Sequence, residues 1–183
     1  MNIAANGGRL RHWSRVPQTV SIEILPLMET DRRWAREFLE EEAGAARMVS
    51  RGRLHQADQL PGYVAVLSGV RAGLLTYRID EGELEVVTLY VRPRQRGVGT
   101  RLLNQALQVA RREGCRRLWL ITTNDNDPAI AFYQRRGMKL VAVHRGALAE
   151  SRKLKPEIPL IGLGGKPIED EIEFETQIRD GEG

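Results

Sequence analysis

The chain has 183 residues, a length that fits one domain with a buried core. Hydrophobic residues make up 42% and charged residues 28%, which excludes a disordered or fibrous protein. No apolar run approaches the ~20 residues that span a bilayer, so we expect no membrane partner. The N-terminal arginines precede no secretory apolar stretch and Cys115 has no second cysteine to pair with, so we expect a cytoplasmic protein.

Charge is distributed unevenly along the chain, although the net charge is only +4. Residues 92–117 contain eight arginines against one acid, a local charge of +7. Residues 151–183 contain five basic and eight acidic residues. The local excess favours a compact polyanion such as a phosphorylated cofactor over a nucleic-acid track. A solvated basic helix face is the alternative that charge alone leaves open.

The first half of the chain predicts one helix and four strands. Alternating apolar residues over 19–25 indicate an edge strand that ends at Pro26. Helical spacing of apolar residues predicts a helix over about residues 30–43. Residues 47–61 show no clear period and are expected to form a loop or a short second helix. Three hairpin-connected strands follow at residues 62–67, 72–79 and 84–91.

The second half predicts helices that alternate with strands. The strongest helix begins around Gly97 and ends at Gly114, with one apolar stripe between them. Asp127 is the expected cap of a later short helix. The other elements are strands at residues 117–123, 138–143 and about 172–174, and a short helix at 147–154. The order predicts an α/β fold with a mixed sheet and one right-handed parallel crossover.

A glycine-containing loop joins the strand that ends at Val91 to the strongest helix. Its residues 94–100 lie where free backbone amides and the positive end of a helix converge, which is how a chain binds phosphate. A P-loop is disfavoured because the segment has no lysine. A dinucleotide fingerprint is disfavoured because Leu102 stands where its third glycine belongs.

This loop resembles the acetyl-CoA pyrophosphate loop of the GNAT superfamily of N-acetyltransferases. The resemblance is carried by Arg94-x-x-Gly97-x-Gly99, by the preceding Leu89-Tyr90-Val91-Arg92-Pro93, and by Asn126-x-x-Ala129-x-x-Phe132-Tyr133-x-x-x-Gly137-Met138. It covers residues 62–143 and implies the GNAT fold. That fold is a mixed, mostly antiparallel sheet of about seven strands with flanking helices and a splayed central strand pair. We expect one such domain over residues 19–178, preceded by a flexible extension over 1–18.

The resemblance also implies that acetyl-CoA is the cosubstrate and assigns its contacts. The backbone of Leu89 and Val91 would bind the pantetheine amides and the thioester oxygen. Asn126 would contact the pantetheine arm, although a turn residue at a helix start is the alternative role. The pyrophosphate would be held by the loop and the first helical turn, namely Arg94, Gln95, Arg96, Gly97, Val98, Gly99 and Thr100.

Two candidate catalytic residues follow from the same resemblance. Tyr133 matches the family tyrosine near the cofactor sulfur and is the expected general acid, with a core aromatic as the alternative. Glu85 lies on the strand leading to the slot and is the expected general base. Glu83 is its rival on the same face, and both could simply line a hairpin. Ile121 stands where some relatives carry a glutamate, so that second arrangement is absent. No metal-ligand spacing is present, and no metal is expected.

The predicted function is transfer of the acetyl group of acetyl-CoA to a primary amine by direct attack in a ternary complex. We expect a small molecule rather than a protein as acceptor. A homodimer is compatible with the sequence. The alternative is a GNAT-fold module that binds acyl-CoA without catalysis. Nucleic-acid binding is disfavoured, because no stacking aromatics are interleaved with the arginines.

Overall fold

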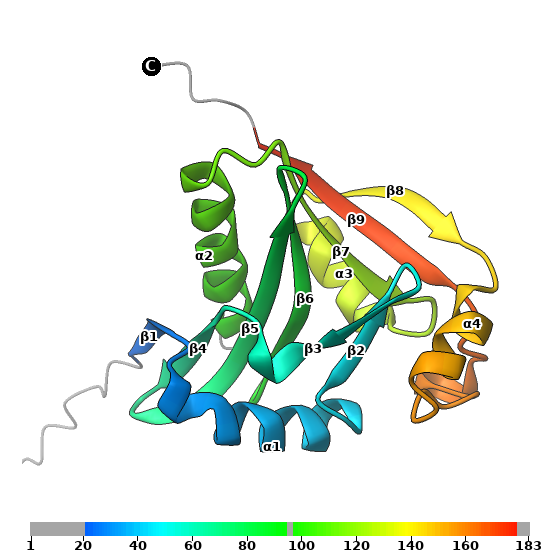
Figure 1. The fold of residues 1–183 in the computed structure, drawn as a ribbon, viewed down its shortest axis with the longest axis horizontal. Helices are drawn as coiled ribbons and strands as arrows, with labels where there is room; N and C mark the ends of the chain where they lie inside the picture. Colours follow the sequence, from blue (N-terminus) through cyan, green and yellow to red (C-terminus); the bar gives the residue numbers. More distant parts are fainter. Residues whose placement is uncertain (1–20, 95–96, 179–183) are drawn as a thin grey trace, which may run out of the picture.

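A seven-stranded mixed sheet forms the centre of the protein in the computed structural model, which describes residues 21–94 and 97–178 (Figure 1). Its strands are Ile22–Pro26 (β1), Gly62–Leu67 (β4), Val70–Asp80 (β5), Glu83–Val91 (β6), Arg117–Thr123 (β7), Lys139–His144 (β8) and Glu171–Gln177 (β9). The strand order is β1-β4-β5-β6-β7-β9-β8. Only β6 and β7 pair in parallel within this sheet of the described residues. The expected mixed, mostly antiparallel sheet is confirmed. The extension expected over residues 1–18 lies outside the described residues.

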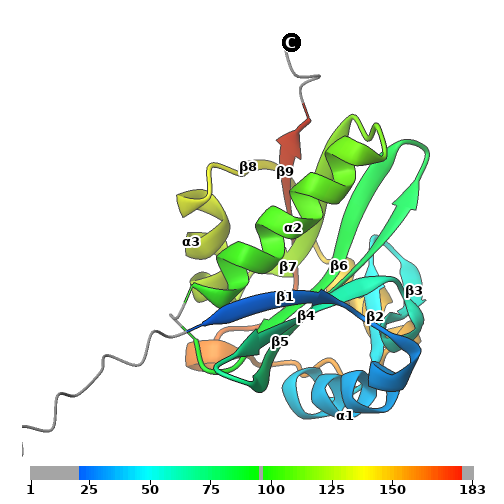
Figure 2. The same cartoon turned by 90° about the vertical axis from the view of Figure 1, so that its left-hand side faces the viewer.

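Helices cover both faces of the sheet. The helices are Arg32–Ala43 (α1), Val98–Arg112 (α2), Asp127–Arg135 (α3) and Ala147–Leu154 (α4), with short 3-10 turns at Glu29–Asp31, Ala57–Gln59 and Leu163–Gly165. Figure 2 shows α2 and α3 on one side of the sheet and α1 on the other. The apolar stripe of α2 is buried in the larger core, which also contains Tyr133 of α3 and Phe174 of β9. Phe38 and Leu39 of α1 belong to the second core. Within the described residues no helix is long and apolar enough to cross a bilayer.

A second, two-stranded sheet occupies the segment expected to be loop or helix, so that expectation is wrong. Arg47–Ser50 (β2) pairs with Arg53–Gln56 (β3) as an antiparallel hairpin. The turn residues Arg51 and Gly52 have φ values of 48° and 73°. Positive φ at both central positions is typical of the type I′ turn, whose twist matches that of paired strands. The hairpin packs on the α1 side of the sheet through the buried Met48.

The central parallel pair is splayed, as the resemblance predicted. Pairing of β6 with β7 runs from Glu83↔Arg117 to Val86↔Leu120 and then stops. Beyond this point β6 continues along β5 as far as Val91, while β7 continues along β9. A register shift in the β5–β6 ladder opposite Thr76 bends β6 where the separation begins. The carboxyl-terminal half of β6 therefore has no strand on its β7 side.

The last strand is inserted between β7 and β8. Its ladder with β7 runs from Arg117↔Gln177 to Thr123↔Glu171, which is longer than the strand expected at 172–174. The connection from α4 to β9 is held against the start of α3. The Oδ1 atom of Asn124 accepts hydrogen bonds from the amides of Glu169 and Asp170 at 2.9 and 3.0 Å. Asp125 Oδ2 accepts from the Leu163 amide at 3.0 Å. The residues after β7 thus fix this connection.

Candidate active site

The splay of β6 from β7 lies beside the N-terminus of α2. Gly97 caps this helix in a left-handed conformation, with φ of 76°. The first intrahelical bond runs from the Arg101 amide to the Gly97 carbonyl at 3.2 Å. The amides of residues 98–100 therefore have no acceptor inside the helix and are available to an anion, where the helix dipole favours negative charge.

The elements around this helix end approach one another closely at Gly99. A Cβ atom at this position would lie 3.4 Å from Phe132 Cζ and 3.8 Å from Val91 Cγ1. Val98 is buried and Thr100 is partly buried in the same turn. Arg94 is exposed where the loop begins. Gln95 and Arg96, which were expected to contact pyrophosphate, lie outside the described residues.

Much of the local basic charge is paired with carboxylates. Of the seven arginines that the structure describes between residues 92 and 117, four form ion pairs with glutamates, namely Arg92, Arg112, Arg116 and Arg117. Arg92 bridges to Glu41 and Glu42 of α1. The pairs of Arg92, Arg116 and Arg117 use glutamates outside residues 92–117 and so offset part of the +7 charge. The pairs of Arg92 also tie the strand end before the loop to α1.

The two candidate bases occupy different environments. Glu83 forms ion pairs with Arg116 and Arg117, the latter at 2.8 Å. Burial works against ionisation of Glu83, but these two guanidinium groups outweigh it and lower its pKa. Glu85 is 3% exposed. Burial raises the pKa of Glu85 to about 7, although Arg78 Nε lies 3.3 Å from its Oε2. Of the two carboxylates, Glu85 is therefore the one whose pKa is raised and Glu83 the one whose pKa is lowered.

Glu85 is hydrogen-bonded to the β2–β3 hairpin. Ser50 Oγ donates to Glu85 Oε1 and lies 2.9 Å from His55 Nε2. Both hairpin residues are buried, at 7% and 5% exposure. Burial, aided by the charge of Arg53, lowers the pKa of His55 to about 4, so the ring is neutral at physiological pH. Sequence reasoning missed Ser50. The Arg51-Gly52 step between alternating residues is the signal that could have predicted this hairpin.

Tyr133 is placed on the other face of the sheet, in the larger core. Its ring lies 5.7 Å from that of Phe174 and 5.3 Å from that of Phe132, centroid to centroid. Burial, with a contribution from the nearby Tyr90, raises the pKa of the Tyr133 hydroxyl. Tyr133 therefore keeps its proton at physiological pH. Strand β6, which carries Glu85, belongs to the sheet that separates the core around Tyr133 from the β2–β3 hairpin.

Asn126 serves as the N-cap of α3. Its side-chain oxygen accepts a hydrogen bond from the Ala129 amide at 3.3 Å. The sequence predicted Asp127 in that position, and this was wrong, because Asp127 is the first helical residue and pairs with Lys166. The capping bond uses the oxygen of Asn126, while its amide NH₂ group can still donate to a ligand.

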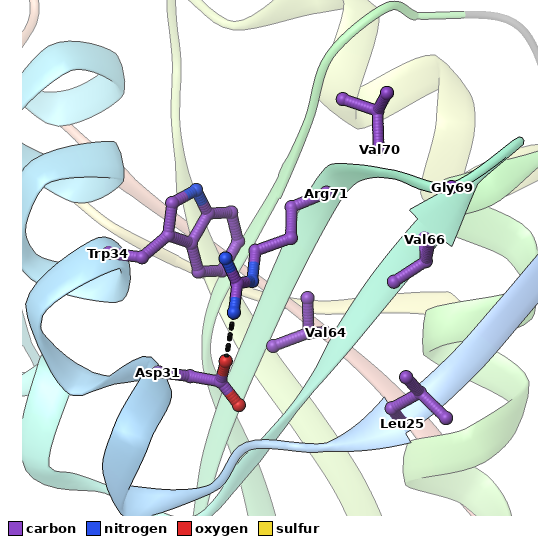
Figure 3. Close-up of a pocket in the computed structure, with 8 residues that line it drawn as sticks. All are labelled: Leu25, Asp31, Trp34, Val64, Val66, Gly69, Val70 and Arg71. Carbon is purple, nitrogen blue, oxygen red and sulfur yellow. Dashed lines mark hydrogen bonds and ion pairs between the residues drawn. The ribbon is translucent and has the colours of Figure 1, made fainter.

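A surface pocket lies away from the splay of β6 and β7. It has a volume of about 550 Å³ and is lined by residues of β1, α1, β4 and β5, none of them from β7 or α3. Figure 3 shows Arg71 reaching across it toward Trp34 and Asp31. Arg71 is hydrogen-bonded to Asp31 at 2.6 Å and stacks 5.4 Å from the Trp34 ring centroid. The charged groups of this pocket already pair with each other, so we do not assign it to the reaction. Among residues 21–94 and 97–178, no group of three or more His, Cys, Asp or Glu side chains could hold a metal ion.

Comparison with known proteins identifies the class to which this fold and splay belong. The model of the acetyltransferase (GNAT) family matches residues 24–138. The chain belongs to the GNAT acetyltransferase family. It is 39% identical over 156 residues to YdhI, an uncharacterized protein of Bacillus subtilis strain 168, covering 85% of this chain and 98% of YdhI.

Solved structures agree with the fold. The ribosomal-protein-S18-alanine N-acetyltransferase from Escherichia coli superposes with a TM-score of 0.63 at 20% identity, covering 88% of this chain and 97% of that one. NAA60 of Arabidopsis thaliana, solved in complex with acetyl-CoA, has a TM-score of 0.62 at 18% identity, covering 86% and 99%. Both structures share the architecture at low sequence identity.

Proposed function

We propose that this GNAT protein transfers the acetyl group of acetyl-CoA to a primary amine by direct attack in a ternary complex. The observation that carries the proposal is the separation of β6 from β7 after Val86, beside the N-terminus of α2. A separated strand offers unpaired backbone groups to the amides of a pantetheine chain. The neighbouring helix end offers amides to its pyrophosphate. The relative solved with acetyl-CoA supports the choice of cosubstrate.

The proposed contacts follow the path of the cosubstrate. Backbone groups of Leu89 and Val91 face the side of β6 without a strand and would bind the pantetheine amides and the thioester oxygen. Asn126 would donate its amide to the pantetheine arm. The pyrophosphate would be bound by the loop and the first turn of α2, namely Arg94, Gln95, Arg96, Gly97, Val98, Gly99 and Thr100.

Glu85 is the proposed general base. A base works best when its pKa lies near the working pH, and burial raises the pKa of Glu85 to about 7. Glu85 lies one residue before Val86, the last residue of β6 that pairs with β7, and so lies next to the point where the two strands separate. Glu83 is a weaker candidate, because its ion pairs with Arg116 and Arg117 hold it ionised. In this role Glu85 takes a proton from the attacking amine.

Tyr133 is the proposed general acid for the departing sulfur. Its raised pKa keeps the hydroxyl protonated throughout the pH range in which an amine reacts. The hydroxyl would hydrogen-bond to sulfur as negative charge develops on it, and so favour cleavage of the carbon–sulfur bond. Packing against Phe132 and Phe174 fixes the direction of the ring.

We expect the acceptor to be a small amine rather than a protein. The named S18-alanine N-acetyltransferase acts on a protein, and it is the rival for acceptor class. The alternative function is an acyl-CoA-binding module without catalysis. One experiment distinguishes a small-amine acceptor from a protein acceptor, and also distinguishes catalysis from binding of acyl-CoA alone.

The test measures release of free thiol from acetyl-CoA by the purified full-length chain. The amines are spermidine, ethanolamine, lysine and a short peptide beginning with alanine. Catalysis is expected to exceed background with at least one small amine, and to fall in Glu85→Gln and Tyr133→Phe. Acetyl-CoA binding without thiol release by any of these amines would favour the non-catalytic module. Turnover of the peptide alone would make the acceptor a protein.

A further inference from the structure

A surface pocket of about 370 Å³ lies where the β2–β3 hairpin meets the end of β5. Its apolar lining side chains are Leu54, Leu60 and Ile79. Leu54 and Ile79 are 44% and 42% exposed, so they present apolar surface to solvent. The charged lining side chains are Arg53, Arg78 and Asp80. The pocket therefore joins apolar surface to two guanidinium groups and one carboxylate.

The guanidinium group of Arg78 is the more buried of the two, and one of its nitrogens is unpaired. The Arg78 side chain is 16% exposed. Its Nε lies 3.3 Å from Oε2 of Glu85, and its Nη2 donates to Asp80. Its Nη1 is buried and has no hydrogen-bond partner among residues 21–94 and 97–178. A buried charged donor without an acceptor costs free energy, so an oxyanion at Nη1 would be stabilising.

The carboxylates beside Arg78 are already engaged. Oδ2 of Asp80 accepts from both Arg78 and Arg53, the latter at 3.1 Å. Oε1 of Glu85 accepts from Ser50, while its Oε2 faces Nε of Arg78. The side chains of Arg53 and Asp80 are 60% and 53% exposed, and an ion pair with such exposure contributes little to stability. This pair can therefore open to admit a ligand oxygen to Nη1.

A short aliphatic carboxylate matches the chemistry of this pocket. Guanidinium groups bind carboxylates through charge-assisted hydrogen bonds. A singly charged ligand is favoured over a doubly charged phosphate, because Asp80 and Glu85 already place negative charge beside the same guanidinium group. We propose that this pocket binds a short aliphatic carboxylate, with an oxygen on Nη1 of Arg78 and the chain against Leu54 and Ile79.

A bound carboxylate adds negative charge beside Glu85 and should therefore raise its pKa further. This consequence rests on the proposed function only in so far as Glu85 is the base, whereas binding itself does not. By reciprocity, protonated Glu85 should bind the ligand more tightly than ionised Glu85. His55 stays neutral, because burial lowers its pKa to about 4. The charged groups that face Glu85 are Arg51 and Arg53 of the hairpin, Arg78 of β5 and Glu171 of β9.

An NMR titration of the full-length protein with isovalerate tests binding without acetyl-CoA or an acceptor. The backbone amide signals of Leu54 and Ile79 are expected to shift and to saturate. Isovaleramide, the neutral isostere, should bind at least about tenfold more weakly, because it lacks the charge that pairs with Arg78. Inorganic phosphate that bound as tightly as isovalerate would overturn the aliphatic class of ligand. Titrations without saturation by any of the three would leave Nη1 to solvent and overturn the site.

Substitutions in the pocket locate the ligand. Arg78→Lys keeps a positive charge without Nη1 and should weaken isovalerate binding at least about fivefold. Asp80→Asn removes the competing carboxylate and should tighten binding about threefold. Leu54→Glu and Leu54→Lys lose the same apolar contact, so the weaker binding expected of Leu54→Glu reports charge alone. Arg112→Gln alters an exposed arginine of α2 and should bind as the parent does. Melting temperatures check folding, and parental affinity in both Arg78→Lys and Asp80→Asn would place the ligand elsewhere.

The pH dependence of binding and turnover tests the coupling to Glu85. Isovalerate stays ionised above pH 6, because carboxylic acids titrate well below that pH. Its Kd should be about two- to fivefold lower at pH 6 than at pH 8, and this difference should vanish in Glu85→Gln. A Kd independent of pH in the parent would overturn the coupling. Isovalerate should also lower kcat near neutral pH, and inhibition competitive with acetyl-CoA would instead place it in the cosubstrate site. Normal turnover in Glu85→Gln would remove the proposed base, while saturable shifts at Leu54 and Ile79 would still support the pocket.

Discussion

The ring of Tyr133 on α3 packs 5.7 Å from the ring of Phe174 on β9, centroid to centroid. Both side chains are buried, and together they join the helix beside the splay to the strand inserted next to β7. The position of the Tyr133 ring is thus determined by apolar packing. Its hydroxyl can be removed without changing that packing.

Tyr133→Phe is therefore expected to fold and bind acetyl-CoA normally while losing at least about tenfold in kcat. The loss arises because no hydroxyl donates to sulfur as the thiolate leaves. Steady-state thiol release and calorimetric binding measure the two quantities. Tyr77→Phe removes a hydroxyl from β5, where Tyr77 stacks on Tyr63, and should change neither. Parental turnover in Tyr133→Phe would assign Tyr133 to packing alone.

Gly99→Glu should abolish the rise in Tm that acetyl-CoA produces in the parent protein. A ligand that binds only the folded state raises Tm by mass action. The substitution puts a negative charge beside the amides at the N-terminus of α2. The matched control is Gln108→Glu, which adds the same charge on the exposed face of α2. A folded Gly99→Glu protein with full affinity would show that the pyrophosphate binds elsewhere.

Arg94→Ala should raise KM for acetyl-CoA about two- to fivefold and leave kcat nearly unchanged. Arg94 is exposed at the start of the loop, where a single ion pair contributes little. Contacts made equally in the ground and transition states affect KM rather than kcat. The effect should shrink as salt is added. Arg111→Ala at the other end of α2 serves as control, and a fall in kcat alone would place Arg94 in the chemical step.

The pH dependence of turnover should report Glu85. In the parent protein the rate should rise with pH through about 7, as Glu85 ionises, and then level off. The turnover rate of Glu85→Gln, divided by that of the parent, should be lowest near neutral pH. It should recover at higher pH, where the amine loses its proton without a base. Parallel profiles for the two proteins would exclude Glu85 as the base, and Glu83→Gln would then be measured.

Ionisation of Glu85 should raise the turnover rate but lower the stability of the folded protein. The pKa of Glu85 is higher in the folded protein than its ordinary 4.5, so the folded state binds the proton more tightly than the unfolded chain. Its contribution to stability is therefore lost as pH rises from about 4.5 to 7. The Tm of Glu85→Gln minus that of the parent should become more positive across this window. A constant difference in Tm would show that the pKa of Glu85 is not raised.

The sequence predicted the elements whose periodicity reflects burial on one face. The stripe of α2 is of this kind and lies where expected. The continuous apolar run of β7, which is buried on both faces, also lies where expected. The β2–β3 hairpin was missed because its strands have four residues each and two of their buried side chains, Ser50 and His55, are polar. Burial of a polar residue depends on a partner such as Glu85 that is distant in sequence, and no local pattern encodes it.

Strand β9 shows the same limit. Its alternation of Ile172 and Phe174 with glutamates predicts a strand with one face in water. Glu171 and Glu173 are nevertheless 1% and 4% exposed. They are held by Ser151, Arg51, Arg117 and His144, which come from α4, the hairpin turn, β7 and β8. The position of β9 between β7 and β8 is a property of the whole topology.

The inserted position of β9 also bears on synthesis of the protein on the ribosome. Within the described chain, β8 has β9 as its partner in the sheet, and β7 is held on its other side by four residue pairs with β6. Residues 139–144 leave the ribosome well before residues 171–177. During that interval the apolar Leu140, Val141 and Val143 of β8 have no strand to join. The nascent chain therefore completes this sheet only after β9 has been synthesised, and truncation before β9 should yield a chain prone to aggregation.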